Sequence, residues 1–127
     1  MSGIRFLLAM LVASAWAALA QAGTELVMIE EDGCIYCARF NREISEIYPK
    51  TAEGKIAPLR RLDIHEPLPD GYAFTSRAVF TPTFVLVVDG QEKGRIEGYP
   101  GDEFFWFLLT ELLRGAGIDP ALAATNG

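Results

Sequence analysis

The chain contains two cysteines, Cys34 and Cys37, and they stand where a strand-like segment gives way to a helix-like one. Residues 24–30, TELVMIE, form a short branched, apolar run that is typical of a buried strand. From Cys34 onward, apolar residues recur at steps of three and four until Pro49, which predicts an amphipathic helix over residues 34–48. The pattern therefore places both cysteines in the first turn of a helix that follows directly on a strand.

A C-x-x-C motif at a helix start has a chemical use that the same residues elsewhere would lack. Unpaired amides and the positive end of the helix dipole stabilise a thiolate on Cys34, and the thiolate is the reactive form. Cys37 lies one turn further on, on the inward face, where it can attack a mixed disulfide on Cys34. Two alternatives are a structural disulfide and a pair of small buried side chains. A disulfide that closes so short a loop stabilises little, so the position favours redox chemistry.

The remaining patterns predict one domain with a mixed sheet flanked by helices. Asp89-Gly90 suits the turn of an antiparallel hairpin, and Asp102 is expected to cap the last helix. The stretch from residue 65 to residue 79 contains prolines and a glycine before a short helical stretch, and it predicts a connection rather than a packed element. The expected elements are strands over 55–64, 83–89 and 91–99 and a helix over 103–114. This order of elements indicates an α/β fold.

The first 22 residues predict a secretory signal peptide. They combine a head carrying Arg5, an apolar run over residues 6–20 and the small-x-small triplet Ala20-Gln21-Ala22. The run of 15 residues is shorter than the roughly 20 that a membrane span needs, although an uncleaved anchor is the alternative. Cleavage before Gly23 predicts a protein outside the cytosol that keeps no membrane anchor.

Composition narrows the class of protein further. The 127 residues carry 17 acidic against 11 basic side chains, a net charge of -6, which excludes a cationic surface for nucleic acid. One histidine and two cysteines cannot fill a structural zinc site without help from carboxylates, so no metal is expected. The predicted division is a signal peptide over 1–22, a domain over 23–117 and a C-terminal tail over 118–127.

From about residue 24 to residue 114 the chain resembles the thioredoxin superfamily. The resemblance rests on the C-x-x-C helix between two strands, on Thr81-Pro82-Thr83 before a strong strand, and on the hairpin and closing helix. It implies a thioredoxin-like α/β fold with a central mixed sheet flanked by helices. It also implies that Pro82 is cis and lies against the active-site disulfide, and that Thr81 offers backbone hydrogen bonds to an extended substrate. Tyr36 is the third residue expected to border the substrate.

Some positions depart from thioredoxin itself. Met28 stands where thioredoxin has a buried acid, six residues before the first cysteine, and Gly33 replaces a tryptophan. Ile35-Tyr36 replaces the Gly-Pro pair between the cysteines. The tyrosine before the second cysteine, together with Thr81, looks more like the glutaredoxins and the periplasmic disulfide isomerases and reductases. A strongly oxidising enzyme is therefore not favoured.

Four charged or titratable residues near the motif are expected to take no part in the chemistry. Glu30 and Glu31 could replace the missing acid, but adjacent acids in a turn are usually exposed, so we expect them to be solvated. Arg39 follows Cys37 by two residues and is given no catalytic role. His65 precedes a Glu-Pro pair and is expected to be a solvated turn residue.

Four sequence motifs, GCIYC, RRLDI, FTPTFVLV and RIEGYPG, make the chain similar to the thioredoxin-like proteins of bacterial sulfur-oxidation (thiosulfate-oxidising) systems. The resemblance implies a monomeric periplasmic thiol-disulfide oxidoreductase that needs no bound cofactor. Its expected substrate is a disulfide or S-thio adduct on a partner such as a sulfur-carrier protein, and a membrane electron donor would reduce it again. The alternatives are a disulfide isomerase or oxidase and a thioredoxin-fold binding module with a stable disulfide.

Overall fold

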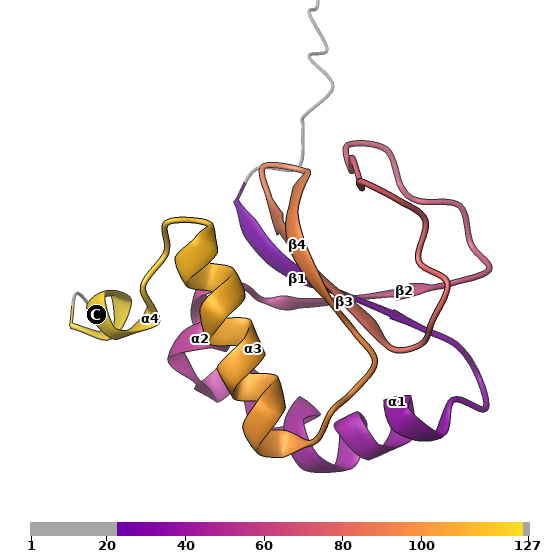
Figure 1. The fold of residues 1–127 in the computed structure, drawn as a ribbon, viewed down its shortest axis with the longest axis horizontal. Helices are drawn as coiled ribbons and strands as arrows, with labels where there is room; N and C mark the ends of the chain where they lie inside the picture. Colours follow the sequence, from indigo (N-terminus) through magenta and orange to yellow (C-terminus); the bar gives the residue numbers. More distant parts are fainter. Residues whose placement is uncertain (1–22, 126–127) are drawn as a thin grey trace, which may run out of the picture.

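The computed structural model describes residues 23–125, so the expected signal peptide over residues 1–22 lies outside the described residues. The strands are β1 Thr24–Glu30, β2 Leu59–Asp63, β3 Thr83–Val88 and β4 Gln91–Glu97. They form one sheet in the order β2-β1-β3-β4 (Figure 1). β1 pairs with β2 in parallel, whereas β3 runs antiparallel to both β1 and β4. The predicted mixed sheet is confirmed.

The Asp89-Gly90 turn between β3 and β4 is also confirmed. Both residues have a positive φ, 50° for Asp89 and 82° for Gly90. A two-residue turn needs this backbone conformation to match the twist of the strands it joins. The turn therefore fixes the hairpin that carries the strongest strand of the chain.

The predicted helix after the C-x-x-C motif is confirmed, although it is not uniform. α1 (Ile35–Phe40) continues directly into a π-helical turn, η1 (Asn41–Ser45), and a 3₁₀ turn, η2 (Tyr48–Lys50), follows. η2 contains Pro49, the residue at which the sequence pattern predicts the end of the helix. The helical path therefore covers the predicted range with a change of winding inside it.

The predicted second strand, residues 55–64, begins too early. Residues at its start belong to a short helix, α2 (Ala52–Ile56), and β2 starts only at Leu59. The Thr51 hydroxyl accepts a hydrogen bond of 3.0 Å from the backbone N–H of Gly54. This cap satisfies one of the free amides at the start of the helix, so it stabilises α2 where the sequence pattern predicts a strand.

The ends of the last helix also differ from the prediction. α3 runs over Asp102–Gly115, and Gly101, not Asp102, is its N-cap residue. Gly101 makes no side-chain cap and has a φ of 103°, a conformation that favours glycine. The expected C-terminal tail, residues 118–127, contains a further short helix, α4 (Pro120–Ala124), which contacts α2.

The central strands bury side chains on both faces of the sheet because successive side chains point to opposite faces. α1 and α3 cover the first face, where Phe40 of α1 contacts Phe84 of β3 and Phe105 of α3, with ring centroids 4.8 and 5.2 Å apart. The second face carries Val27, Ile29, Val85 and Val87. The helices thus flank the sheet mainly on one side.

The segment from residue 64 to residue 82 covers the second face. The predicted connection is confirmed, but the predictions that it contains a short helical stretch and is not a packed element are wrong. It forms no helix, and its backbone pairs with a strand through an isolated bridge between Ala73 and Gln91. Tyr72, Phe74 and Ala78 of this segment pack on the sheet. The segment that leads to Pro82 is therefore a cover for the core as well as a connection.

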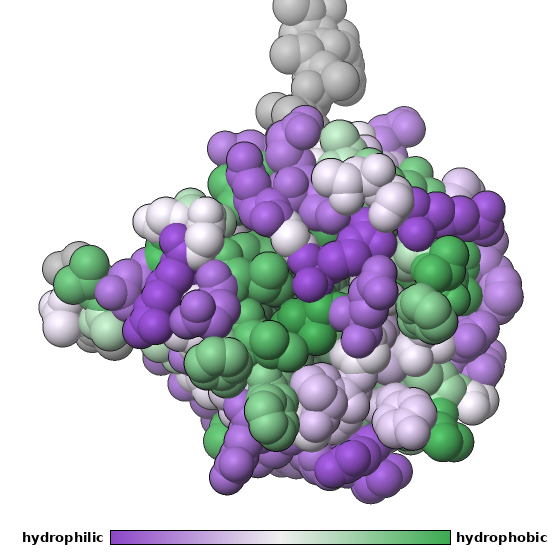
Figure 2. Space-filling view, in the orientation of Figure 1, coloured by the Kyte–Doolittle hydropathy of each residue, from purple (hydrophilic) through white to green (hydrophobic). Residues whose placement is uncertain are grey.

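Apolar side chains gather on the face shown in Figure 2, in the region of α3, with polar side chains around them. Phe104 and Phe107 of α3 are 64% and 60% exposed, whereas Phe105 between them is buried. Trp106 is half-buried and its ring stacks on Tyr48 with centroids 6.0 Å apart. One side of α3 therefore closes the core and another presents two phenylalanine rings to solvent.

Candidate active site

A tight turn after the end of β1 sets the position of Cys34. The backbone N–H of Cys34 donates a hydrogen bond of 3.4 Å to the carbonyl of Glu31. Gly33, inside this turn, has a φ of 78°, where a side chain would be strained. The glycine that replaces the tryptophan of thioredoxin therefore serves the geometry of the turn.

Cys34 and Cys37 form a disulfide with their Cα atoms 5.2 Å apart. Cys34 is the N-cap residue of α1, and its Sγ accepts a hydrogen bond of 3.1 Å from the backbone N–H of Cys37. An N–H aimed at sulfur stabilises the negative charge of a thiolate. Cys34 is half-buried, whereas Cys37 is only 4% exposed. This arrangement suits Cys34 for attack on a partner and Cys37 for the internal resolving step.

The second half of the site is the loop that leads into β3. The Thr81–Pro82 peptide bond is cis, as the family resemblance predicts, and Pro82 is buried. The Pro82 carbonyl accepts a hydrogen bond of 2.7 Å from the N–H of Gly98, in the segment after β4. The Thr83 hydroxyl donates to the carbonyl of Phe80 at 2.6 Å. These bonds hold the loop between the sheet and the start of α3.

The prediction that Glu30 and Glu31 are simply solvated is wrong, because both carboxylates have partners. Glu30 pairs with Arg61 of β2. Glu31 Oε1 accepts a hydrogen bond of 2.8 Å from the Thr81 hydroxyl, and Glu31 Oε2 lies 3.1 Å from His65 Nε2. The His65 side chain is 76% exposed, as expected for a turn residue, but it lies against this acid. The turn after β1 and both ends of the connection between β2 and β3 thus meet at Glu31.

Met28 occupies the place of the buried acid of thioredoxin and is fully buried. It belongs to the same core cluster as Cys37. Its cross-strand neighbour Arg61 approaches the Met28 sulfur with one guanidinium nitrogen at 3.5 Å. The second guanidinium nitrogen of Arg61 donates to Asn41 and Ser45 of η1. The Arg61 guanidinium therefore contacts four side chains, those of Met28, Glu30, Asn41 and Ser45. It lies beside the Met28 thioether, at the position where thioredoxin has a carboxylate.

Arg39 points back to its own helix and to the loop before α3. Its guanidinium pairs with Glu43 at 2.8 Å and lies 5.6 Å from the centre of the Tyr99 ring. The buried Tyr99 donates its hydroxyl hydrogen bond to Glu43 at 2.5 Å. Hydrogen bonds from Tyr99 and then from Arg39 lower the pKa of the Glu43 carboxyl. These contacts hold Arg39 against Glu43 and Tyr99, and the expectation that it takes no part in catalysis stays a prediction.

Apolar side chains are exposed on both segments of the site. Ile35 and Tyr36, between the cysteines, are 72% and 52% exposed, and Val79 and Phe80, before Thr81, are 69% and 58% exposed. The bond between Thr81 and Glu31 brings the second pair beside the turn that carries Cys34. We call Ile35, Tyr36, Val79 and Phe80 the apolar rim.

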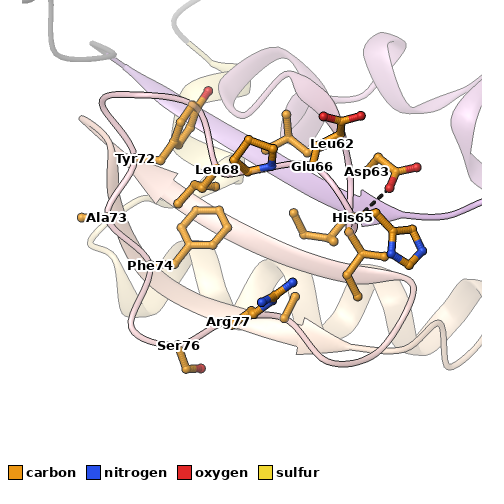
Figure 3. A pocket seen from close by; sticks show the side chains of 14 residues that line it. Leu62, Asp63, His65, Glu66, Leu68, Tyr72, Ala73, Phe74, Ser76 and Arg77 are labelled. Carbon is orange, nitrogen blue, oxygen red and sulfur yellow. Dashed lines mark hydrogen bonds between the residues drawn. The ribbon is translucent and has the colours of Figure 1, made fainter.

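A cavity of about 730 Å³ lies against the second face of the sheet, next to this site. Figure 3 shows Tyr72 and Phe74 at one end, His65 at the other, and the Arg77 side chain reaching between them. The Asp63 carboxylate accepts a hydrogen bond from the backbone N–H of His65 at 2.7 Å. Because His65 also contacts Glu31, this end of the cavity adjoins the catalytic turn. The apolar part of its lining includes Ile29, Leu62, Ile64, Leu68 and Ala78.

Residues 23–125 contain neither a cluster of metal-ligating side chains nor a helix that could span a membrane. Within this range no three histidine, cysteine or acidic side chains come together as a metal site would require. No helix in the same range has the length and apolar character needed to span a membrane.

Sequence reasoning missed the partnership of Glu31 with Thr81 and the exposure of Val79 and Phe80. Glu31 and Thr81 are 50 residues apart, so no local pattern could pair them. An acid three residues before the first cysteine and a threonine before the proline were both visible. Only the packing of the two loops shows that they belong together.

Comparison with known proteins agrees with this geometry. No protein family profile matches the chain. The disulfide bond formation protein of Brevibacillus choshinensis is 32% identical over 95 residues, which cover 72% of this chain and 75% of that protein. The periplasmic thioredoxin SoxS from Paracoccus pantotrophus, whose crystal structure was determined in the reduced form, has 48% sequence identity to this chain. The two structures are similar with a TM-score of 0.72. The match covers 73% of this chain and 98% of SoxS. With its thioredoxin fold and its C-x-x-C pair, the chain belongs to the thioredoxin-like thiol-disulfide oxidoreductases.

Proposed function

We propose that this protein is a periplasmic reductase of disulfides or S-thio adducts on a partner protein, with Cys34 as nucleophile and Cys37 as resolving thiol. The observation that carries the proposal is the contrast between the two sulfurs. Cys34 is half-buried at the helix cap and accepts an N–H, while Cys37 is buried directly behind it. The Cys34 sulfur is thus placed to react with a partner, and the Cys37 sulfur is placed to react with Cys34.

The reaction runs in two exchanges. The Cys34 thiolate attacks one sulfur of the partner's disulfide, an S–S bond forms between the proteins, and the partner's other sulfur leaves as a thiolate. The Cys37 thiolate then attacks the Cys34 sulfur and releases the partner as a thiol after proton uptake. Two electrons have passed to the partner, and the enzyme holds the Cys34–Cys37 disulfide seen in the structure. A dithiol donor, for which we propose a membrane protein, must return two electrons.

The apolar rim supports a protein or peptide substrate. Exposed apolar side chains grouped around a reactive residue indicate a surface for another chain. Tyr36, Thr81 and Pro82 are the residues that we assign to substrate binding, with Ile35, Val79 and Phe80 extending the contact. A sulfur-carrier protein, as in the sulfur-oxidation systems whose proteins the motifs resemble, is our proposed partner.

The periplasmic location rests on two observations. The first 22 residues have the pattern of a cleaved signal peptide. The similar protein SoxS is described as a periplasmic thioredoxin. Sequencing the amino terminus of the protein purified from the periplasm tests this proposal, because cleavage before Gly23 leaves glycine as the first residue.

Trapping of the mixed disulfide tests the assignment of the two cysteines. The Cys37→Ser variant should form a stable covalent adduct with a peptide that contains an activated cysteine disulfide, and dithiothreitol should release it. The Cys34→Ser variant is the matched control and should form none. Adduct formation by Cys34→Ser, or its absence in Cys37→Ser, would show that the roles are wrong.

Disulfide oxidation is the second candidate, because the Brevibacillus relative is named a disulfide bond formation protein. The equilibrium reduction potential of the pair, titrated against a thiol redox buffer, separates the two directions. A value near the roughly -270 mV of thioredoxin, or between it and the glutaredoxins, fits a reductase. A value toward roughly -120 mV fits an oxidant, and a disulfide that never exchanges fits a binding module.

A further inference from the structure

Two segments that are distant in sequence, the turn after β1 and the connection between β2 and β3, converge on one carboxylate beside the active site. Glu31 follows β1, His65 follows β2, and Thr81 precedes β3. Each of the last two contacts a different oxygen of Glu31, Thr81 at 2.8 Å and His65 at 3.1 Å. The carboxylate therefore joins loops that the sheet alone would leave independent.

The two contacts differ in their surroundings. The His65 side chain is 76% exposed, so water competes with its contact to Glu31. The Thr81 hydroxyl bond is partly buried. Water competes less for this partly buried bond, so the Glu31–Thr81 hydrogen bond is the dominant of the two contacts.

The position of Glu31 gives this bond a consequence for the reaction. The carbonyl of the same residue accepts the N–H of Cys34 and so closes the turn that delivers the nucleophile. Its side chain meanwhile holds Thr81, the residue before Pro82, in the loop that we assign to substrate binding. Glu31 therefore contacts both the residue that carries the attacking sulfur and the loop that contains Thr81.

We propose that Glu31 is a positioning residue, which sets the substrate loop relative to Cys34 through its hydrogen bond to Thr81. This inference rests on the proposed function, since it concerns how a protein substrate is held for attack. Glu31 acts through Thr81 and not on the sulfur. Its loss therefore weakens the handling of an extended substrate and spares that of a small disulfide that does not use the loop.

The test compares Glu31→Ala, Glu31→Gln, Thr81→Val and the double variant Glu31→Ala/Thr81→Val. Reduction of insulin disulfides with dithiothreitol as donor is the first readout, and reduction of hydroxyethyl disulfide is the second. Loss of one charge-assisted hydrogen bond should lower kcat/KM for insulin roughly tenfold in Glu31→Ala and in Thr81→Val, mainly through KM. The double variant should be no slower than either single variant, because both remove the same bond.

Two further variants separate the bond from the charge and from the histidine. Glu31→Gln keeps an oxygen that can accept the Thr81 hydroxyl and should recover most of the insulin activity. His65→Asn removes the exposed contact and should change kcat/KM for insulin less than twofold. The proposal is overturned if Glu31→Gln is as slow as Glu31→Ala while Thr81→Val is normal, or if His65→Asn reproduces the loss.

Amide hydrogen exchange over residues 79–83 tests the positioning without any substrate. Exchange should be faster in Glu31→Ala and Thr81→Val than in the unaltered protein, and unchanged in His65→Asn. If the unaltered protein fails to reduce insulin, the proposed function fails but the exchange result still stands. Unchanged exchange in both variants would overturn the positioning role whatever the activity.

Discussion

Phe40 of α1 lies against Phe84 of β3 with ring centroids 4.8 Å apart, and both side chains are fully buried. Phe40 also meets the rings of Tyr99 and Phe105, at 5.6 and 5.2 Å. The helix that carries both cysteines is therefore fixed to the sheet and to α3 through one side chain. This packing contributes to the position of Cys37, which belongs to the same core cluster as Phe40.

Replacement of Phe40 by alanine should lower the free energy of unfolding by about 3–5 kcal/mol, because it removes a buried ring and leaves a cavity. Urea denaturation of the oxidised protein measures the change. Phe107→Ala is the matched control, since that ring is 60% exposed, and it should shift the free energy by about 0.5 kcal/mol or less. Equal losses in the two variants would contradict the described core.

The Tyr48 hydroxyl donates a hydrogen bond of 2.6 Å to the carbonyl of Ala57, and both residues are buried. Tyr48→Phe leaves that carbonyl without its partner and should cost about 1–3 kcal/mol near neutral pH.

The same hydroxyl predicts a loss of stability in alkali. Burial, followed by the nearby charge of Glu53, raises the pKa of Tyr48 well above its usual range. Below a pH of about 10 the tyrosine is neutral in both the folded and the unfolded chain. Above it only the unfolded chain ionises readily, so stability falls as the pH rises toward the folded pKa. Unfolding curves from pH 7 to pH 11 should show a smaller decline in Tyr48→Phe than in the unaltered protein. An identical decline would contradict the prediction.

Two glycines with positive φ should respond differently to alanine. At Gly33 a Cβ would meet nothing within 4 Å, so Gly33→Ala costs only the backbone conformation, about 1–2 kcal/mol. At Gly90 a Cβ would lie 2.0 Å from the carbonyl oxygen of Gly71, so Gly90→Ala must also displace backbone. Thermal unfolding should rank Gly90→Ala as clearly the less stable variant, and the reverse order would contradict the described turn.

Phe80 is 58% exposed in the apolar rim, so its replacement should affect binding more than folding. Phe80→Ser should raise KM for a protein disulfide about tenfold, as expected for one well-placed aromatic contact, and leave hydroxyethyl disulfide reduction unchanged. Steady-state kinetics with both substrates measure this. The exposed Phe104 of α3 offers a matched Phe104→Ser control, which should leave KM for both substrates unchanged. A similar rise in KM in the control would remove the rim from the binding surface.

The sequence was sufficient to predict the elements that long or strongly patterned segments form. The run TFVLVV, the turn at Asp89-Gly90 and the period of the helix after Cys34 each determine their structure through local physics. α2 was missed because five residues are too few for a periodic signal, and its Thr51 cap lies inside a polar stretch. The N-cap of α3 was misplaced because glycine can cap a helix without any side chain.

The same distinction between local sequence signals and tertiary contacts applies to the candidate site. Cys34 and Cys37 were predicted from motif spacing together with the family resemblance, whereas Pro82 was predicted from the resemblance alone. The partners of Glu31 could not, because their contact depends on the sheet bringing the ends of β1, β2 and β3 to one place. The solvated state predicted for adjacent acids is a statistical expectation, and a tertiary contact overrides it.

Cys34 is more exposed to solvent than Cys37, and this difference affects how the protein responds to oxidative damage. Peroxide meets the half-buried Cys34 first, and a thiolate there is converted to a sulfenic acid. Cys37, held with its Cα 5.2 Å away, can condense with that sulfenic acid and expel water before a second oxidation occurs. The product is the Cys34–Cys37 disulfide, an ordinary member of the catalytic cycle. An oxidant that would irreversibly inactivate an enzyme with a single reactive cysteine thus leaves this one as a disulfide that a dithiol can reduce again.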